Sequence, residues 1–358
     1  MNEEIKVVKL SENDTDRWNK LLFTANTSSH RLNLIDQYYK RIDGRENETF
    51  IFNKNGNDIA GAHYSTTRNF KRLFKVAEIN SGILFKESPD PYLIAFIIND
   101  FQNWAKENRC MYMSITPWLP KEIDGRITDN VDMFQNVAER ANLTALKKGR
   151  HTYWIDLNKS EEELMAGIRK KRRRILKRAL KSNFEFRCIE KPDEEIIHKF
   201  GDLHHSLRMR KGLKQKNRDH FESYIKKTLS EGLAFLFITR CNDEIVNLAL
   251  TSKIGDAIGI YSSINTKDIN NQECYSPGTM SKWDTILALK HKGYRIHNMG
   301  YSPGKTPIKG HPKYDIWHFK YGFGGMHVEY LPTYGKTIEP IRGNMYKYLK
   351  YKIKNDDA

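Results

Sequence analysis

The stretch that decides the fold is FIFNKNGNDIAG at residues 50–61, because it recurs as LFITRCNDEIVN at residues 236–247. The two copies lie 186 residues apart, and Ile59 of the first matches Ile245 of the second. The same offset relates two pairs of prolines, Pro91 with Pro277 and Pro117 with Pro303. Each copy is expected to form short strands, a turn marked by proline, a helix and a further strand. Solenoid repeats have periods of roughly 20–50 residues, so this longer period predicts a duplicated domain.

The length and composition are those of a folded protein with two domains. The chain has 358 residues, of which 39% are hydrophobic and 29% charged, so each half can bury its own core. The apolar run at 92–98 stops at Asn99 and Asp100, well short of the roughly 20 residues that span a membrane. The N-terminus shows no basic segment followed by an apolar one, so no secretory signal is expected.

The cysteines and histidines give no metal-site pattern. Four cysteines lie far apart without a CxxC pair: Cys110, Cys188, Cys241 and Cys274. We therefore expect neither a zinc finger nor a disulfide framework, and a cytoplasmic location. No HExxH or GxSxG motif occurs, so neither a metal nor a serine nucleophile is expected. No cofactor is predicted.

The charge is strongly positive. Sixty Lys and Arg residues against 44 Asp and Glu give a net charge of +16. Such an excess favours polyanionic partners, namely nucleic acid, nucleotide diphosphates or an anionic membrane face to which the protein is peripheral. The alternative is a solvated lysine-rich surface without a partner.

The pattern of elements divides the chain into two halves. Residues 1–151 are expected to form a first domain and residues 152–330 a second, with a basic helix in 331–358 that returns to the first. Amphipathic helices are predicted at 92–107 and 279–292, and one continuous helix from Ser160 to about Lys181. Where a helix connects two parallel strands, ligands bind at the carboxyl ends of the strands.

The densest basic run is IRKKRRRILKRALK at 168–181. On a continuous helix, an apolar stripe of Leu164, Ile168, Ile175 and Ala179 would place Arg172 on the buried side. Outer cations could neutralise the phosphates of a nucleic acid. The candidates for this role are Arg172, Arg173, Arg174 and Lys177. A solvated basic face is the competing interpretation.

Two further stretches carry lysines in unusual settings. GYSPGKTP at 300–307 lacks the glycine that a Walker A loop needs five residues before GK, so it is no nucleotide-hydrolysis loop. Its Lys305 could line a substrate site or stand on a surface turn. DIWHFKYGFGG at 315–325 places Lys320 next to Phe319 and ahead of paired glycines. A buried lysine is costly unless it meets an anion; the alternative is an amine that snorkels to solvent at a strand end.

Taken together, these stretches resemble the FemABX family of non-ribosomal peptidyltransferases. TYWIDLNKSEEELMAGIRKKRRRILKRA at 152–179 is similar to the entry of that family's second domain, with Arg173, Arg174, Ile175 and Ala179 in its basic motif. LHHSLRMRKGL at 203–213 looks like its helix that ends in an arginine and a glycine. IGIYSSI at 258–264 and the run 315–325 look like its closing segments. The resemblance covers roughly residues 30–335.

The resemblance implies an α/β fold of two tandem GNAT-like domains, of the acyl-CoA N-acyltransferase type. Their central sheets would be mixed, with a cleft in or beside the second domain. It also implies transfer of an amino acid from aminoacyl-tRNA to an amine of a cell-envelope precursor linked to a nucleotide or lipid diphosphate. By matching motif, Lys40 and Arg210 would contact the diphosphate and Tyr261 would line the acceptor site. Lys320 would stabilise charge at the reacting carbonyl.

Two alternative functions remain open from the sequence. The same superfamily contains acyl-CoA-dependent enzymes, which would here acylate an amino sugar or polysaccharide precursor. Against this, neither KESPDPY at 86–92 nor ECYSPGTM at 273–280 fits the Q/R-x-x-G-x-G/A loop that holds the CoA pyrophosphate. A non-catalytic nucleic-acid-binding protein would explain the charge but leaves Lys320 without a role.

Overall fold

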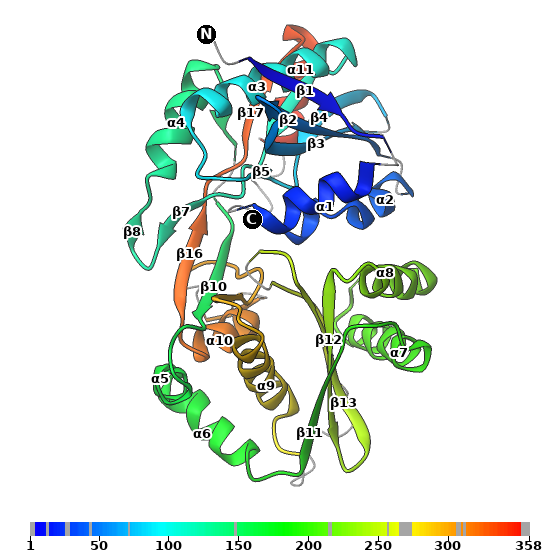
Figure 1. Cartoon of the computed structure of the whole chain (residues 1–358), viewed down its shortest axis with the longest axis vertical. Coiled ribbons are helices and arrows are strands. Elements are labelled where there is room, and N and C mark those ends of the chain that lie inside the picture. The colour runs from blue at the N-terminus through cyan, green and yellow to red at the C-terminus, as the bar shows by residue number, and fades with distance from the viewer. Residues whose placement is uncertain are drawn as a thin grey trace. The chain divides into compact units, whose positions relative to one another are not determined.

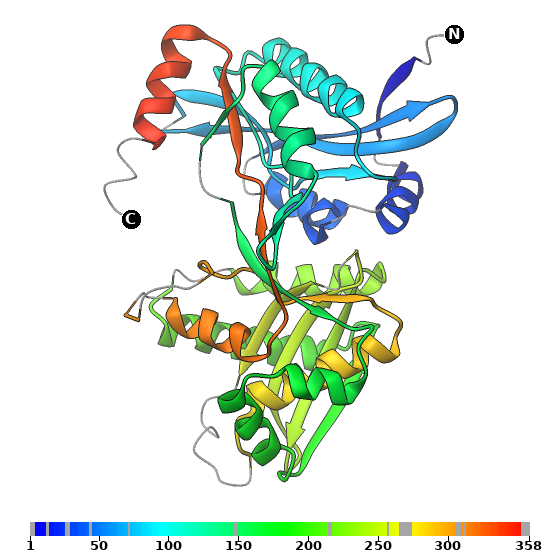
Figure 2. The same cartoon turned by 90° about the vertical axis from the view of Figure 1, so that its left-hand side faces the viewer.

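The computed structural model describes residues 4–11, 14–25, 29–42, 45–70, 72–146, 149–213, 217–255, 258–264, 274–305, 309–310 and 313–351. The chain divides into two compact units, Met1–Arg150 with Val328–Ala358, and His151–His327. Each combines a sheet with helices on both of its faces (Figures 1 and 2). Within the described ranges, no helix is both long and apolar enough to cross a membrane.

The first unit is built on a large mixed sheet. Its strand order is β1 (Ile5–Lys9), β2 (Glu46–Lys54), β3 (Asn57–Asn69), β4 (Phe74–Ile79), β6 (Tyr112–Ile115), β17 (Tyr334–Thr337) and β9 (Thr144–Ala145), with β5 (Ile83–Phe85) paired to β3. Only the β4–β6 pair is parallel among these pairs. A hairpin of β7 (Pro120–Ile123) and β8 (Arg126–Ile127) pairs with the end of β16 (Met326–Tyr330). Its helices are α1 (Thr15–Thr24), η2 (His30–Leu32), α2 (Leu34–Ile42), α3 (Pro91–Glu107), α4 (Asn130–Arg140) and α11 (Pro340–Tyr351).

The middle of strand β3, residues 60–66, is buried on both faces of the sheet. Ala62 and Tyr64 pack in the same core cluster as the apolar residues of α3 and α4. Gly61 and His63 point the other way, because side chains alternate along a strand. A Cβ at Gly61 would lie 2.6 Å from the Trp18 ring of α1, so only glycine lets that helix approach. The two faces therefore carry different helices.

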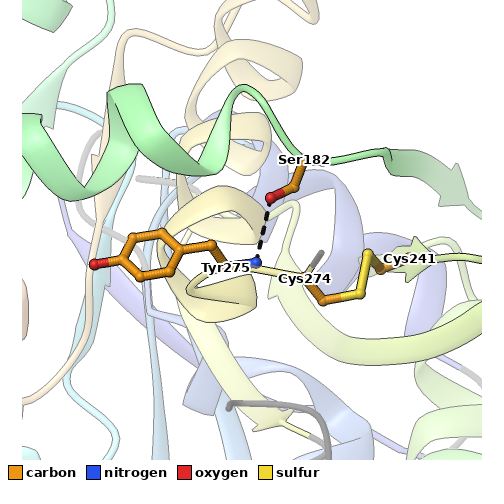
Figure 3. The surroundings of a disulfide bond; sticks show 4 residues. All are labelled: Ser182, Cys241, Cys274 and Tyr275. Carbon is orange, nitrogen blue, oxygen red and sulfur yellow. Dashed lines mark hydrogen bonds between the residues drawn. A yellow bond between two sulfur atoms is a disulfide. The ribbon is translucent and has the colours of Figure 1, made fainter. Parts of the chain in front are cut away.

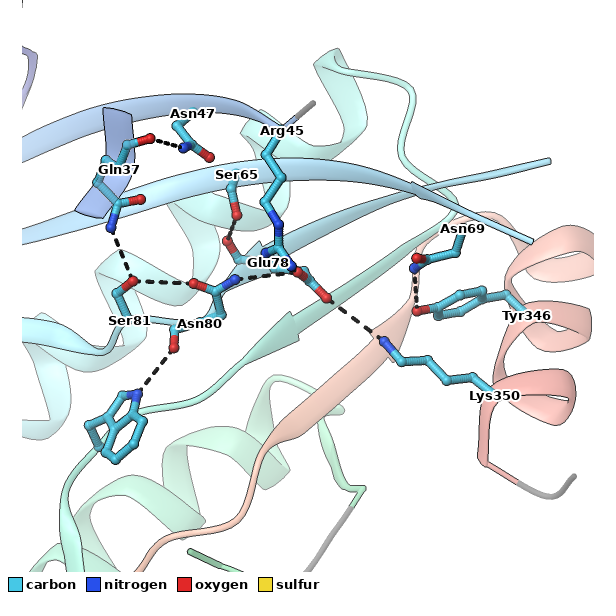
Figure 4. Close-up of polar contacts among 11 residues, drawn as sticks. Gln37, Arg45, Asn47, Ser65, Asn69, Glu78, Asn80, Ser81, Tyr346 and Lys350 are labelled. Carbon is cyan, nitrogen blue, oxygen red and sulfur yellow. Dashed lines mark hydrogen bonds and ion pairs between the residues drawn. The ribbon is translucent and has the colours of Figure 1, made fainter. Parts of the chain in front are cut away.

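The C-terminal helix α11 packs onto the first unit. Tyr346 is fully buried in a cluster with Phe74, Val76 and Tyr112. Its hydroxyl accepts a hydrogen bond of 3.0 Å from the Asn69 side-chain amide. Figure 4 shows this contact beside the carboxylate of Glu78, which lies 3.8 Å from the Lys350 amine. The buried Tyr346 ring and these polar contacts thus hold α11 against β4 and β6.

The second unit has a four-stranded antiparallel sheet in the order β11 (Phe184–Ile189), β12 (Ala234–Cys241), β13 (Glu244–Ser252) and β14 (Gly259–Ile264). Strand β10 (His151–Asp156) pairs with β15 (Ile296–Asn298). Its helices are α5 (Glu161–Gly167), α6 (Lys170–Ala179), α7 (Glu194–Arg210), α8 (Arg218–Ser230), α9 (Pro277–His291) and α10 (Tyr314–Gly322). Helix α9 shares a core cluster with Phe235 and Phe237, and α7 and α8 cover the opposite face (Figure 1).

The two units repeat the same order of elements, as the sequence predicts. The β2–β3 hairpin corresponds to β12–β13, and α3 and α9 each begin with the matched proline, Pro91 or Pro277. They differ where a helix leads to the next strand. In the first unit, β4 and β6 are hydrogen-bonded in parallel over Val76–Ile79 and Tyr112–Ile115. Their counterparts β14 and β15 belong to different sheets within the described residues. In the second unit, the sheet is therefore interrupted between β14 and β15.

The continuous helix predicted for 160–181 is wrong, because the chain breaks into α5 and α6. Ile168 and Arg169 are extended, with ψ of 131° and 141°. The Arg169 backbone N–H donates to the Gly322 carbonyl at 3.0 Å, a bond that a continuous helix would not permit. The break shifts the helical phase, so Leu176 rather than Ile175 is fully buried. The predicted start of the helix at Ser160 is confirmed, and a capping box with Glu163 is present there.

The prediction that no cysteines pair is also wrong. Cys241 at the end of β12 forms a disulfide with Cys274, with Cα atoms 6.0 Å apart. Figure 3 shows the neighbouring contact, in which the Tyr275 backbone N–H donates to the Ser182 hydroxyl at 3.2 Å. The two cysteines are 33 residues apart in the chain, so their pairing depends on the tertiary fold. The bridge ties this hairpin to the segment before α9.

Candidate functional site

Lys320 lies in helix α10, not at a strand end, and its amine is held against backbone oxygens. The amine donates to the carbonyls of Met299 at 2.5 Å and Tyr301 at 2.7 Å. Burial, together with the charge of Lys282, lowers the pKa of Lys320 to about 7. The amine thus exchanges its proton near neutral pH and gains from any negative charge that forms beside it.

A second lysine, Lys282 of helix α9, approaches the same region. Its amine lies 3.2 Å from Nε2 of His297, a fully buried residue of β15. Burial lowers the pKa of Lys282 to about 8. The side chains of Lys282 and Lys320, from helices α9 and α10, therefore approach the same region beside β15. Burial there disfavours the charged form of both amines.

Gly300 allows the two lysines to approach the same region, and Gly259 lies beside it. A Cβ at Gly300 would lie 3.1 Å from the Gly259 carbonyl and 3.5 Å from the Lys320 amine. A Cβ at Gly259 would lie 3.9 Å from the Lys282 amine. Gly300 also has a φ of 76°, which favours glycine. The backbones of β14 and the loop after β15 thus come close at the point where both lysines end.

The same positions in the first unit are apolar. Subtracting the 186-residue offset from Lys282 and Lys320 gives Phe96 and Phe134. Phe134 of α4 is fully buried in the first core, and Phe96 of α3 packs against that core. The first unit therefore has buried aromatic side chains where the second unit has two lysines. Its strands β4 and β6 are hydrogen-bonded to each other in parallel.

Phe319 and Arg172 contact each other, as part of the packing of α10. The Arg172 guanidinium lies 4.7 Å from the centre of the Phe319 ring and donates to the Thr279 hydroxyl at 2.9 Å. Burial lowers the pKa of Arg172. The prediction that this guanidinium points inward is confirmed. Because it is engaged within the unit, Arg172 joins α6 to α9 and α10.

The other basic candidates of α6 face outward. Arg174 and Lys177 are exposed and have no protein partner within the described residues. Arg173 is partly buried, and its guanidinium donates to the Ala166 carbonyl at 3.0 Å. Residues three or four apart share a helix face, so the three cations form one basic surface, here called the α6 surface.

The remaining sequence candidates lie elsewhere. Arg210 is exposed at the end of α7. The Tyr261 ring lies among aromatic residues of α7 and α8, 5.1 Å from Phe221 and 5.5 Å from His204. Lys305 has an exposed side chain, and its carbonyl accepts from Trp317 Nε1 at 2.8 Å. Lys40 belongs to α2, but its side chain lies outside the described part of the chain.

Sequence analysis missed Lys282 and His297. The available signal was a lysine within TMSKWDTILAL of α9, a stretch whose other charged residue is Asp284. Comparison with Phe96 at the same place in the first copy would have sharpened it. His297 gave no local signal, because a histidine in a short strand is most often a packed core residue.

Asp284 of α9 is a further buried carboxyl, and it makes a stability prediction possible. Burial raises its pKa to about 7, and its Oδ2 has no hydrogen-bond partner among the described residues. A folded-state pKa above the unfolded value means that stability falls as the pH rises from about 4 to 7. Asp284→Asn should therefore raise the free energy of unfolding by about 2 kcal/mol at pH 8 and leave it unchanged at pH 4. Urea unfolding at both pH values measures this, and a destabilised variant at pH 8 would reveal a cationic partner instead.

Comparison with known proteins identifies the family to which the chain belongs. The FemAB family model matches residues 22–244, which is more than half of the chain. The chain belongs to the FemAB family. The aminoacyltransferase FemA of Staphylococcus aureus (strain NCTC 8325 / PS 47) is 24% identical over 193 residues, covering 50% of this chain and 44% of FemA. The FemA of strain MW2 matches to the same extent. The chain thus spans less than half the length of the curated relatives it matches.

Solved structures confirm the fold expected for a FemAB protein. A crystal structure of FemX superimposes with a TM-score of 0.81 at 12% identity, over 96% of this chain and 100% of FemX. A tandem GNAT protein from the clavulanic acid biosynthesis pathway gives 0.54 at 11% identity, over 94% and 99%. The prediction of two tandem GNAT-like domains with mixed sheets is therefore confirmed, at identities that inform the fold alone.

Proposed function

We propose that this chain is an aminoacyltransferase that moves an amino acid from aminoacyl-tRNA to an amine of a cell-envelope precursor. The precursor would carry a nucleotide or lipid diphosphate. The observation that carries the proposal is the pair of buried lysines, Lys282 and Lys320, in the second unit of a member of the FemAB family whose curated relatives are named aminoacyltransferases. The net charge of +16 suits both polyanionic substrates.

The chemistry needs little covalent help from the protein. The acceptor nitrogen bonds to the ester carbonyl carbon, the bond from that carbon to the ribose oxygen breaks, and a proton passes from the amine to the departing hydroxyl. The main barrier is the charge that develops on the carbonyl oxygen. Lys320 is a fixed cation whose amine already points at oxygen atoms, those of Met299 and Tyr301. It is the residue that best fits this charge.

An acyl-CoA donor is the second candidate, because the fold is GNAT-like. The start of α9 does not favour it. Pro277 at the first turn has no backbone N–H to offer a pyrophosphate. The Tyr275 N–H is already bound to Ser182, and the Arg178 guanidinium lies 4.0 Å from the centre of the Tyr275 ring. This helix start is therefore engaged by the protein itself.

The donor decides between these functions. The full chain is incubated with tRNA charged with a radiolabelled amino acid, or with labelled acetyl-CoA, each with a UDP-linked cell-wall peptide precursor. We expect label to move from tRNA to the precursor, and no transfer from the CoA ester. Consumption of acetyl-CoA alone would overturn the proposal. Binding of tRNA without any transfer would point to a nucleic-acid-binding protein.

A further inference from the structure

We propose that Lys282 is a second functional residue of this site, a positioning residue that His297 holds in place and that acts through its electrostatic repulsion of the Lys320 ammonium. The inference rests on the proposed role of Lys320 in acyl transfer. It concerns a residue pair that the family resemblance did not point to, and it can be tested without any transfer reaction.

The geometry gives Lys282 a fixed position. Its amine is 3.2 Å from Nε2 of the buried His297, and both residues belong to elements that pack in the second unit, α9 and β15. Gly259 lies beside this amine, since a Cβ there would be in ordinary contact with it at 3.9 Å. The same glycine carbonyl lies beside Gly300, which in turn borders the Lys320 amine. The amines of Lys282 and Lys320 therefore lie on either side of the contact between Gly259 and Gly300.

No carboxylate among the described residues offsets the repulsion of Lys320 by Lys282. The charged or titratable group that acts on Lys320 among the described residues is Lys282 of α9, with His297 of β15 behind it. Two further cations, Arg169 and Arg172 of α6, lie over the rings of Tyr321 and Phe319 on the same helix as Lys320. Within that part of the chain, no carboxylate acts on the charge of Lys320. Asp284 lies two residues from Lys282 on α9, and residues two apart do not share a helix face. The charge of Lys282 therefore acts on Lys320 without a described carboxylate to offset it.

Repulsion of this kind has a chemical use. A lone lysine with its ordinary proton affinity would hold its charge through neutral pH and interact with substrate and transition state alike. A lysine crowded by a second cation gains most when an oxyanion appears beside it, because the new negative charge relieves the repulsion. Phe96 at the corresponding place in the first unit provides no such charge, in keeping with a unit that only packs.

The test measures the proton of Lys320 directly. The full chain is labelled with ¹³C,¹⁵N-lysine, and the Lys320 side-chain signal is assigned by its loss in Lys320→Met. Its titration is then followed by NMR in Lys282→Met, and in Lys282→Gln as a second variant in case the first does not fold. We expect the midpoint of Lys320 to rise by about one pH unit in either variant, since a like charge has been removed.

Lys290→Met is the matched control. Lys290 lies on the same helix and its amine contacts the Leu157 carbonyl at 3.1 Å, away from Lys320. A midpoint of Lys320 that stays in place in folded Lys282 variants, or that moves equally in Lys290→Met, would overturn the inference. Failure of the proposed transfer reaction would leave this titration unaffected, so the two hypotheses fail separately.

Discussion

Lys320→Met is expected to lower the turnover of aminoacyl transfer by about 10²–10³-fold, the usual cost of removing one oxyanion donor. Methionine keeps the length and the apolar packing of the side chain and deletes only the charge. Acceptor affinity should change little, because the interaction is made mainly in the transition state. Steady-state kinetics with charged tRNA and a UDP-linked precursor separate the two parameters.

Folding must be controlled in this variant, because the Lys320 amine also binds the carbonyls of Met299 and Tyr301. Lys313→Met is a matched control, since Lys313 precedes the same helix and lies 5.1 Å from the centre of the Tyr301 ring. Circular dichroism and thermal melting should remain near those of the parent chain. Full activity in folded Lys320→Met would refute the role. A large loss of stability would show that the lysine is structural.

The pH dependence of the same reaction follows from the lowered pKa of Lys320, about 7. If the cationic form stabilises the oxyanion, kcat/KM should fall as the pH rises above about 7, since this parameter reports the free enzyme. Removing Lys282 should move that falling limb to higher pH. A profile that rises through pH 8 in the parent chain would show instead that the neutral amine is the active form.

Much of the fold followed from local patterns. The hairpins at 46–69 and 234–252 contain runs of buried strand residues, and Pro91 and Pro277 mark helix starts that the structure has. The elements that were missed depend on tertiary contacts. Strand β11 has alternating exposed residues and forms only because β12 lies beside it, and β17 crosses 219 residues of sequence to pair with β6.

Helix α10 shows why the site was harder to predict than the fold. Its sequence YDIWHFKYG mixes aromatic with ionisable residues and has no separate polar face, and periodicity cannot separate a buried helix from a strand in such a segment. The break at Ile168 and Arg169 was likewise hidden, because it is fixed by Gly322 and by Gly324, where a Cβ would lie 2.2 Å from the Gly167 carbonyl. Such contacts join residues more than 150 positions apart, and no local pattern encodes them.

The Lys282–His297 contact has the same origin. Neither residue is unusual in its own segment, and their meeting depends on how α9 packs on β15. The duplication offers the one route from sequence to this pair, because Phe96 shows what the position holds when it serves packing alone. In a duplicated chain, the residue at the matched position of one copy thus shows what packing alone requires, and a difference in the other copy indicates function.

The second large effect is expected at the α6 surface. The double variant Arg173→Glu with Arg174→Glu should weaken tRNA binding by about 10–100-fold near 0.1 M salt, because two cations that neutralise phosphates become anions that repel them. The plot of log affinity against log salt should flatten by roughly 0.7–0.9 for each phosphate that is no longer neutralised. Filter binding over a range of salt concentrations measures both quantities.

The structure sharpens the choice of residues for this experiment. Arg173 also donates to the Ala166 carbonyl at the end of α5, so its replacement can disturb the turn between the two helices. Arg174→Glu with Lys177→Glu removes the same charge from two exposed residues without protein partners in the described chain. Both double variants should therefore lose tRNA affinity alike. An effect confined to the variant that contains Arg173 would identify a structural role for that residue, and unchanged binding in both would show that the α6 surface is only solvated. Lys106→Glu with Arg140→Glu, exposed on α3 and α4 of the first unit, changes the net charge equally and should bind as the parent chain does.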